Sequence, residues 1–287
     1  MKQVQDFLEL IKFEHTIFAL PFAYLGMLLA AGGWPTWHQF IWITIAMAAA
    51  RTLAMAANRI ADRVIDARNP RTDQRPLVTG AISLKTAWGG SILAALILAL
   101  AAWQLGPLPL RLLPGANIFL LGYSFTKRFT WLSHFFLGFT DGLAPVGAWA
   151  AIRGSLFTVS DLPAWILLAV VTLWIGGFDL IYACQDVEYD RQYGLKSIPA
   201  LFGVALALRF SSICHALTVM LLVVLGMLLG LGWPYWIGMV VVVGLLFWEH
   251  SLVRPDDLSR IDVAFFNINS YISLTLFISI LVALYIS

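Results

Sequence analysis

Residues 42–76 read "WITIAMAAARTLAMAANRIADRVIDARNPRTDQRP" and pass from an apolar run into the most polar stretch of the chain. Within this stretch, residues 58–76 hold three aspartates and five arginines. The chain as a whole is the opposite in character, because 60% of its 287 residues are hydrophobic and only 12% are charged. Soluble domains carry roughly a quarter charged residues. The sequence therefore predicts an all-α, polytopic membrane protein.

Long apolar segments follow one another along the chain, and about 20 such residues span a bilayer as a helix. We expect nine transmembrane helices, at about 15–33, 37–57, 84–105, 108–125, 131–152, 163–185, 203–230, 233–249 and 264–286. They would form one membrane-embedded domain over residues 1–287. Before the first span, apolar residues recur at helical spacing (Val4, Phe7, Leu8 and Ile11). This spacing predicts that residues 1–14 form an amphipathic helix in the membrane interface.

Basic residues are distributed unevenly between the two predicted sides of the membrane. Of the 18 lysines and arginines, all but Arg111 and Arg153 fall on the N-terminal side. Because basic residues mark the cytoplasmic side, we expect a multi-pass protein of the cell membrane. Its N-terminus and polar loops would be cytoplasmic and its C-terminus outside. The net charge of only +2 argues against a nucleic-acid partner, and no obligate protein partner is indicated.

Two groups of aspartates have the same spacing. Asn58, Asp62 and Asp66 are four residues apart, and Asp186 and Asp190 repeat the interval. Four residues place side chains on one face of a helix, where like charges repel each other. A cation is therefore expected between them. Carboxylate and amide oxygens are hard ligands that suit Mg²⁺, so the sequence predicts Mg²⁺ held by these five residues.

Cationic side chains accompany both aspartate groups on the predicted cytoplasmic side. A metal held by carboxylates, together with forked or point-charge cationic donors, is what a diphosphate needs. The candidate donors are Arg71, Arg75, Lys127 and Lys196. The alternative interpretation is that these residues are solvated helix ends and loop charges that set topology. Two groups with one spacing on one predicted side favour a joint site.

Other ionisable residues lie deeper in the predicted spans. Arg51 precedes Asn58 by seven residues, and Asp179 precedes Asp186 by seven, so each would lie on the same face as the group that follows it. An ionisable residue within an apolar span is a functional candidate by default. By contrast, the acidic residues near the C-terminus are expected to form an ordinary solvated loop (Glu249, Asp256, Asp257 and Asp262), and the five histidines are scattered and interpreted as structural.

Four motifs in this order resemble those of the UbiA superfamily of intramembrane prenyltransferases. "NRIADRVID" (58–66) is similar to the family's N-D-x-x-D-x-x-x-D, with Arg59 in place of the first aspartate. "NPRTDQRPLVTG" (69–80) resembles its RT-x-x-RP-x-x-x-G continuation, and "YSFTKRFTWLSHFFLG" (123–138) its Y-x-x-x-KR-x-T segment. "DLIYACQDVEYDRQYGLKSIPALFG" (179–203) resembles its second aspartate motif. The resemblance extends over nearly the whole chain.

Within the superfamily, the sequence is most similar to the 4-hydroxybenzoate polyprenyltransferases. This resemblance implies Mg²⁺-dependent transfer of a polyprenyl group from its diphosphate to an aromatic acid, in quinone biosynthesis and in contact with membrane lipid. The form N-R-x-x-D-x-x-x-D-A-x-N-P-R-T also occurs in a branch with members assigned to menaquinone synthesis. There the acceptor is 1,4-dihydroxy-6-naphthoate, so the acceptor stays open between the two acids.

The resemblance also implies roles for individual residues. The residues implied in catalysis are Asp62, Asp66, Asp186, Asp190 and Lys127. Those implied in substrate binding are Arg51, Asn58, Arg71, Arg75, Tyr123, Asp179, Tyr182 and Lys196. Among these, Arg51 would bind the carboxylate of the aromatic acid, and the two tyrosines would shield a carbocation with their ring faces.

Two other classes of membrane protein use carboxylates in this way. A cation-coupled transporter would have charged or broken-helix positions near the membrane midplane, whereas here the acids gather at predicted helix ends among arginines. A phospholipid-headgroup transferase also uses spaced aspartates, but its D-G-x-x-A-R-type signature is absent from the sequence. The sequence favours the prenyltransferase.

Overall fold

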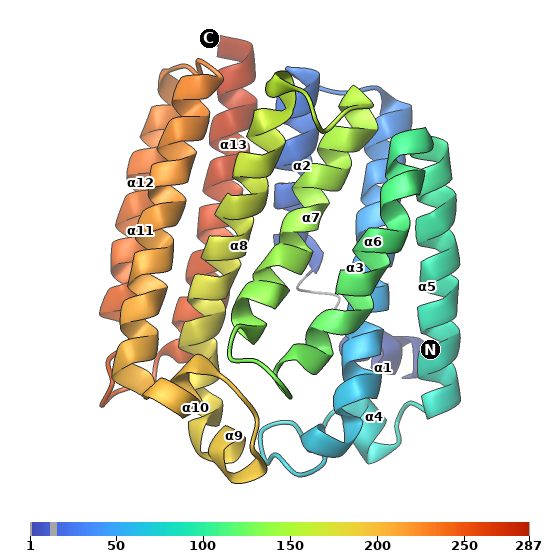
Figure 1. The fold of residues 1–287 in the computed structure, drawn as a ribbon, viewed down its shortest axis with the longest axis vertical. Coiled ribbons are helices and arrows are strands. Elements are labelled where there is room, and N and C mark those ends of the chain that lie inside the picture. The colour runs from blue at the N-terminus through green and yellow to red at the C-terminus, as the bar shows by residue number, and fades with distance from the viewer. Residues whose placement is uncertain (1, 12–15, 287) are drawn as a thin grey trace.

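The structure is a computed structural model that describes residues 2–11 and 16–286. Helices make up the regular secondary structure of these residues, with no strand among them, which confirms the all-α prediction (Figure 1). In chain order they are α1 (Lys2–Leu10), α2 (Thr16–Ala31), α3 (Trp37–Asp66), α4 (Pro76–Thr79), α5 (Leu84–Leu105), α6 (Pro107–Thr126), α7 (Ser133–Arg153), η2 (Val159–Asp161), α8 (Leu162–Ala183), η3 (Cys184–Asp186), α9 (Val187–Tyr193), α10 (Ile198–Phe202), α11 (Val204–Leu228), α12 (Trp233–Ser251), η4 (Val263–Ile268) and α13 (Asn269–Ile286).

Each predicted span coincides with a helix of the bundle. By length and composition, six helical segments of the described chain could cross a membrane: Trp37–Asp66, Leu84–Leu105, Ser133–Arg153, Val159–Tyr193, Val204–Leu228 and Val263–Ile286. The helices α2, α6 and α12 run alongside them (Figure 1). Six candidate spans are therefore found, and the count of nine stays a prediction.

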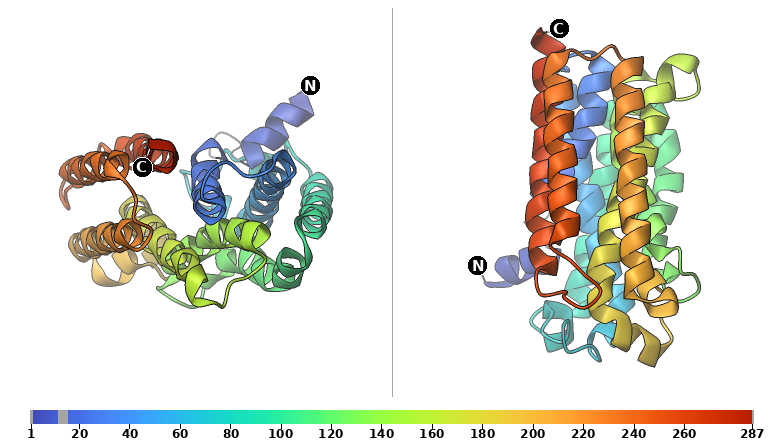
Figure 2. Two further views of the ribbon diagram at one scale, coloured as in Figure 1. Left: turned by 90° about the horizontal axis from the view of Figure 1, so that it is seen from above. Right: turned by 90° about the vertical axis from the view of Figure 1, so that its left-hand side faces the viewer.

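The long helices form a bundle with a clear order in cross-section. Figure 2 shows α11, α12 and α13 on one side, α3, α5 and α6 on the other, and α2, α7 and α8 between them. Two contacts in the middle of the bundle require glycine. A Cβ on Gly26 of α2 would lie 2.2 Å from the carbonyl oxygen of Pro145 in α7, and one on Gly138 of α7 would lie 2.3 Å from that of Thr172 in α8. These glycines let the backbones of α2, α7 and α8 approach closely.

Helix α3 is long enough to carry the first aspartate group beyond the apolar layer. It starts at a capping box in which Thr36 and Gln39 satisfy each other's backbone N–H groups. Its 30 residues extend about 45 Å at 1.5 Å per residue, against roughly 30 Å for the hydrocarbon core of a bilayer. The last turns, which contain residues 58–66, therefore project from one end of the bundle.

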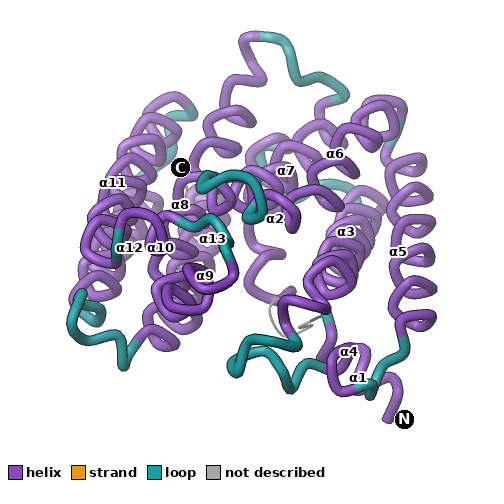
Figure 3. Tube along the Cα trace, turned by 60° about the horizontal axis from the view of Figure 1, so that its bottom comes forward, coloured by secondary structure: helices purple, strands orange, loops and turns teal. Residues whose placement is uncertain are grey.

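The second aspartate group projects from the same end by a different route. Helix α8 continues through the single turn η3 into α9, which carries Asp186 and Asp190 past the end of the bundle. Helix α9 ends at Gly194, whose φ of 67° favours glycine. Figure 3 shows α9 facing the loop that follows α3. Residues more than a hundred positions apart in the chain thus meet at one end.

Helix α1 lies at this same end, beside α4 (Figure 1). Its last residue, Leu10, is fully buried and packs in a small cluster with Leu77, Ile82 and Ala87. The predicted amphipathic helix over residues 1–14 thus corresponds to α1, although residues 12–14 lie outside the described chain. Whether α1 lies in a membrane interface stays a prediction.

Candidate active site

A polar pocket of about 150 Å³ lies where the ends of α3 and α8 meet. It gathers residues from both aspartate motifs and from the loop after α6. Its lining is Asn58, Asp62, Ile65, Asp66, Asn69, Arg71, Thr72, Arg75, Lys127, Asp186, Tyr189, Asp190 and Leu195. All five predicted metal ligands are therefore brought together, as the shared spacing indicated.

The aspartates of α3 are buried and each is paired with a cation. The carboxylate of Asp62 is 2% exposed, and its Oδ2 lies 2.6 Å from Lys127 Nζ. Arg128 approaches the other oxygen at 3.4 Å. The Oδ2 of Asp66 lies 2.6 Å from Arg75 Nη1. These side chains come from α3, from the loop after it and from the end of α6, so the pairs tie three segments together.

Asp186 is held by a two-pronged contact. Arg71 donates from Nε to Oδ1 at 3.0 Å and from Nη2 to Oδ2, and Asn69 Nδ2 donates to Oδ1 at 3.1 Å. A third nitrogen of Arg71 donates to the hydroxyl of Tyr182 at 3.0 Å. Burial alone would lower the pKa of Arg71, but the hydrogen bonds and charge of Asp186 outweigh it, so the pKa is raised above its ordinary value. Arg71 is therefore positively charged in the pocket.

The side chains of Asp190 and Lys196 have different surroundings, and only that of Asp190 lines the polar pocket among the residues described. Asp190 lines the pocket and accepts a hydrogen bond from Ser197 Oγ at 2.7 Å. The ammonium of Lys196 donates instead to the backbone carbonyl of Phe129 at 3.2 Å. Among the described residues of this loop, the pocket is lined by Leu195. The observed geometry therefore does not support the predicted role of Lys196 as a diphosphate donor, because its ammonium is hydrogen-bonded to the loop after α6.

A larger apolar cavity of about 380 Å³ lies further along the same segments. Helix α3 lines both spaces, and α6 and α8 line the cavity while the residues that follow them line the polar pocket. Along α3 the cavity residues Arg51 and Ala54 precede Asn58, and along α6 Tyr123 precedes Lys127 by one turn. Along α8, Asp179 lines the cavity and Asp186, seven residues later, lines the pocket. The two spaces are therefore stacked along one axis of the bundle.

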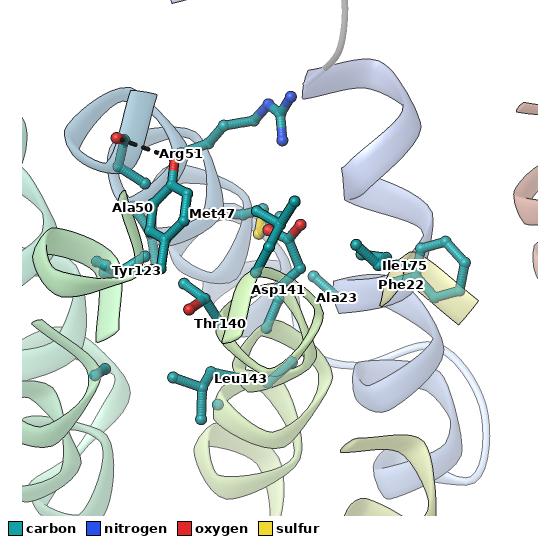
Figure 4. Close-up of a pocket in the computed structure, with 18 of the residues that line it drawn as sticks. Phe22, Ala23, Met47, Ala50, Arg51, Tyr123, Thr140, Asp141, Leu143 and Ile175 are labelled. Carbon is teal, nitrogen blue, oxygen red and sulfur yellow. Dashed lines mark hydrogen bonds between the residues drawn. The ribbon is translucent and has the colours of Figure 1, made fainter. Parts of the chain in front are cut away.

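Arg51 stands out in this cavity because its Nε is buried and has no hydrogen-bond partner within the described chain. Figure 4 shows it together with Tyr123 of α6 and with Thr140 and Asp141 of α7, all lining the same space. A buried guanidinium that lacks a full set of partners is a ready site for an anion. Sequence reasoning missed Asp141, although an aspartate inside a predicted span was a visible signal.

Asp179 lies in the cavity, and its Oδ2 is 2.7 Å from Nδ1 of His134. The family resemblance implied a role for Asp179 in substrate binding, and the structure places it in the lining of the apolar cavity. The predicted role of Tyr182 changes, because its ring stacks on Phe265 with centroids 4.1 Å apart. Phe265 lines the cavity, whereas Tyr182 is not among the described residues that line it. Three residues of this region were not singled out from the sequence: His134, Asn69 and Ser124, whose Oγ accepts a hydrogen bond from Asn58 Nδ2 at 3.0 Å.

Arg59, which replaces an aspartate of the family motif, turns away from the polar pocket. It is 7% exposed, and its Nε donates to the backbone carbonyl of Leu10 at the end of α1 at 3.3 Å. Its Nη1 donates to Oδ1 of Asn58 at 3.3 Å. Arg59 therefore anchors α1 and holds the neighbouring amide. Its described hydrogen bonds are to Leu10 and Asn58, so it does not occupy the carboxylates of Asp62 and Asp66.

The donor set fits a hard divalent cation. The atoms that line the pocket from the aspartate motifs are carboxylate and amide oxygens, the ligands that Mg²⁺ prefers. The cations that pair with them lie at the rim, where side chains such as Lys127 and Arg71 are about a third exposed. Their partial exposure leaves these side chains room to adopt other positions.

One sequence expectation about charged residues is wrong. Glu249, expected in a solvated loop, lies in the last turns of α12 and is fully buried. It accepts a hydrogen bond from Asn269 Nδ2 at 2.9 Å. The error arose because the predicted span ended at residue 249, two residues before the helix does. Asp256 and Asp257 are exposed, as expected.

Fold and site together define a helical membrane protein with a stacked pair of spaces, one lined by acids and bases and one apolar. The chain belongs to the UbiA prenyltransferase family, which residues 19–271 match. It is 35% identical to a 4-hydroxybenzoate octaprenyltransferase of Cupriavidus necator over 84% of this chain and 82% of that protein. It is 31% identical to one of Vibrio campbellii over 90% and 89%.

Solved structures show the same fold. The apo structure of a UbiA homolog from Aeropyrum pernix K1 superposes with a TM-score of 0.86 at 35% identity, covering 94% of this chain and 98% of that one. A UbiA homolog from Archaeoglobus fulgidus bound to GPP and Mg²⁺ superposes with a TM-score of 0.65 at 20% identity, covering 94% and 99%. The second likeness extends to the fold alone.

Proposed function

We propose that this protein transfers a polyprenyl group from a polyprenyl diphosphate to the ring of an aromatic acid and releases diphosphate. The observation that carries the proposal is the succession of the two spaces along α3 and along the segments that continue α6 and α8. A prenyl diphosphate has a charged head and an apolar tail joined at the reacting carbon. A polar pocket followed by an apolar cavity along the same segments is complementary to such a molecule.

The polar pocket would bind the diphosphate head. Asn58, Asp62, Asp66, Asp186 and Asp190 would hold Mg²⁺, which supplies positive charge to the departing diphosphate as a Lewis acid. Arg71, Arg75 and Lys127 would move from their carboxylates to phosphate oxygens. The bond between the allylic carbon and oxygen breaks with both electrons leaving on diphosphate, so donors fixed at this point stabilise the transition state.

The apolar cavity would hold the acceptor and the tail. Arg51 would bind the acceptor's carboxylate through the guanidinium nitrogen that has no protein partner. Tyr123 would face the electron-deficient prenyl carbon with its ring. The ring carbon of the acid then forms a bond with that carbon and loses its proton. Asp141 and Asp179 line the cavity, and one of them would accept this proton.

The acceptor that we propose is 4-hydroxybenzoate, in ubiquinone synthesis. Its support is that the curated relatives at 30–35% identity are named for this acid. 1,4-Dihydroxy-6-naphthoate also carries a carboxylate on an aromatic ring, so Arg51 does not separate the two. Family membership and the placement of the acids at one end of the bundle favour the enzyme over a cation-coupled transporter.

A product assay tests the proposal directly. Purified protein in detergent or liposomes is given Mg²⁺, a radiolabelled polyprenyl diphosphate and one acid at a time: 4-hydroxybenzoate, 1,4-dihydroxy-6-naphthoate, or benzoate as a control without a hydroxyl. Prenylated 4-hydroxybenzoate as the main product supports the proposal. Prenylated naphthoate in its place corrects the acceptor, and no prenylated acid under any condition refutes the reaction.

A further inference from the structure

A second group of potential metal ligands lies away from both substrate spaces, between α11 and α12. His215 of α11 and Glu249 and His250 of α12 each bring one ligand atom to within 4.8 Å of the other two. His215 and Glu249 are 2% and 0% exposed. None of the three lines the polar pocket or the apolar cavity. The proposal below therefore does not rest on the proposed function.

Hydrogen bonds fix which nitrogen of each histidine faces the cluster. Nε2 of His215 lies 3.2 Å from the carbonyl oxygen of Trp174, so it must carry the proton and leave a lone pair on Nδ1. Nδ1 of His250 lies 3.3 Å from the hydroxyl of Ser212. Because Ser212 donates its own proton to Leu208, His250 must donate to it and keeps a lone pair on Nε2.

These two lone pairs point at each other and at a carboxylate. Nδ1 of His215 lies 2.9 Å from Nε2 of His250 and 3.4 Å from Oε2 of Glu249. That carboxylate oxygen is buried without a hydrogen-bond donor among the residues described. Three electron-rich atoms in a buried space repel one another unless a cation lies between them.

We propose that His215, Glu249 and His250 bind a divalent transition metal, of which Zn²⁺ fits best. Two imidazole nitrogens and one carboxylate oxygen, with a water molecule as fourth ligand, are an established zinc donor set. Ligands at about 2.0–2.1 Å in a tetrahedron lie about 3.3 Å apart. The two nitrogens need to open by only a few tenths of an ångström. This set is softer than the all-oxygen pocket and selects a different metal.

The surroundings are built as a metal site requires, since each ligand has a partner that orients it. Trp174 of α8 orients His215, Ser212 of α11 orients His250, and Asn269 of α13 orients Glu249. A Cβ on Gly177 of α8 would lie 2.5 Å from Nε2 of His215, so a glycine there makes room for the ring. The metal would join α11 to α12 directly, with its supports on α8 and α13.

The test is metal binding by the full chain, purified without a histidine tag and stripped with chelator. Zn²⁺ is added in excess Mg²⁺, which keeps the aspartate pocket occupied by its own metal, and bound zinc is measured by elemental analysis. We expect about one Zn²⁺ per chain, as one three-ligand site holds. Loss of a supporting partner alone weakens such sites 10–100-fold, so Glu249→Gln and His250→Ala should each weaken binding by at least about 100-fold.

Matched controls separate this site from others. His38→Ala removes an exposed histidine and Asp62→Asn alters the polar pocket, and both should retain zinc. If Asp62→Asn loses zinc while Glu249→Gln keeps it, the metal binds in the polar pocket and the proposal is wrong. Failure of the unaltered chain to retain zinc also overturns it, and would mean that a shared proton holds the cluster.

A spectroscopic measurement needs no variant. Co²⁺ in a tetrahedral site of two nitrogens and two oxygens gives intense visible absorption, whereas an octahedral oxygen site gives only weak bands. Strong bands in the unaltered chain that Zn²⁺ displaces and Mg²⁺ does not would support the proposal. Weak bands alone would contradict it, even if Glu249→Gln and His250→Ala failed to fold.

Discussion

Nζ of Lys127 lies 2.6 Å from Oδ2 of Asp62, and so closes an ion pair between α6 and α3 over the polar pocket. The side chain of Lys127 is about a third exposed, whereas that of Asp62 is buried. Under the proposed function, Lys127 would move toward the diphosphate while Asp62 stays in place. The buried carboxylate of Asp62 would then need Mg²⁺ as its new cation.

This asymmetry predicts the effect of changing either aspartate group. Asp62→Asn and Asp186→Asn keep the shape of the side chain but remove a metal-binding charge, and charge stabilisation of this kind contributes about 10²–10³ in kcat. We expect each variant to lose at least that factor, measured as initial rates of prenyl transfer with saturating substrates. Asp256→Asn, in an exposed loop, is the control. Undiminished transfer by either variant in the presence of EDTA would refute the metal role.

Arg51 should determine the affinity for the acceptor. Hydrogen bonds to charged groups contribute about 1.5–3 kcal/mol, so Arg51→Leu should raise KM for the aromatic acid about 10- to 150-fold and leave KM for the prenyl diphosphate nearly unchanged. The variant should also discriminate less between the acid and its amide. Arg111→Leu, exposed at the other end of the bundle, serves as control. A rise confined to the diphosphate KM would instead place Arg51 in diphosphate binding.

Arg59 should matter for stability more than for chemistry. Arg59→Asp restores the aspartate of the family motif, but it removes the hydrogen bond to Leu10 and buries a third carboxylate beside Asp62 and Asp66. We expect a loss of at least about 2 kcal/mol in the free energy of unfolding, seen as a lower melting temperature in detergent, and no gain in activity. Arg63→Asp, at an exposed position of the same helix, should melt near the unaltered protein. Equal melting of the two variants would contradict the anchoring role.

The two glycine contacts in the bundle core make a further prediction. A Cβ at position 138 would meet the backbone of Thr172 at 2.3 Å, whereas one at Gly147 of the same helix meets nothing within 4 Å. Gly138→Ala should therefore force α7 and α8 apart and lower the melting temperature, at a cost of about 1–3 kcal/mol for overpacking. Gly147→Ala should leave the melting temperature unchanged or raise it. A harmless Gly138→Ala would show that the helices can separate freely.

Topology can be measured with single cysteines, because Cys184 and Cys214 are both buried. Asp73→Cys and Gln192→Cys lie at the aspartate end of the bundle, and Val159→Cys lies at the opposite end, where it is 92% exposed. An impermeant thiol reagent should label the first two from the cytoplasmic side only and the third from the outer side only. Labelling of positions 73 and 192 from different sides would separate the two aspartate groups and refute the shared site.

The periodic patterns of the sequence predicted the positions of the helices and the faces on which the aspartates lie. The apolar runs predicted where helices lie, the interval of four residues predicted that the aspartates of each group share one face, and the common side of the membrane predicted that the two groups form one site. These inferences hold because helical geometry fixes the face on which a residue lies once the helix is known. The apolar pattern did not predict the end of α12 correctly, because helix ends depend on local capping. Glu249 was therefore expected in a solvated loop.

Contacts between distant segments could not be read in the same way. The pairing of His134 with Asp179, the turn of Arg59 toward Leu10 and the use of Lys196 by the loop carbonyl of Phe129 all depend on how helices are rotated against each other. Spacing along one helix carries no information about such rotations. Sequence could name these residues as charged, but it could not say which partner each would meet.

The ion pairs of the polar pocket have a thermodynamic consequence for substrate binding. Binding of metal alone would leave the cations Lys127, Arg71 and Arg75 without their carboxylate partners and next to a further positive charge. Binding of diphosphate alone would take these cations away from the aspartates and leave the aspartates unpaired. Mg²⁺ therefore neutralises the aspartates that diphosphate would leave unpaired, and diphosphate neutralises the cations that Mg²⁺ would leave unpaired. Binding of either ligand thus favours binding of the other. Such coupling is reciprocal by linkage: whatever factor Mg²⁺ adds to the affinity for diphosphate, diphosphate adds to the affinity for Mg²⁺. If the proposed function holds, the pocket would bind the pair together and would bind Mg²⁺ alone or phosphate alone only weakly.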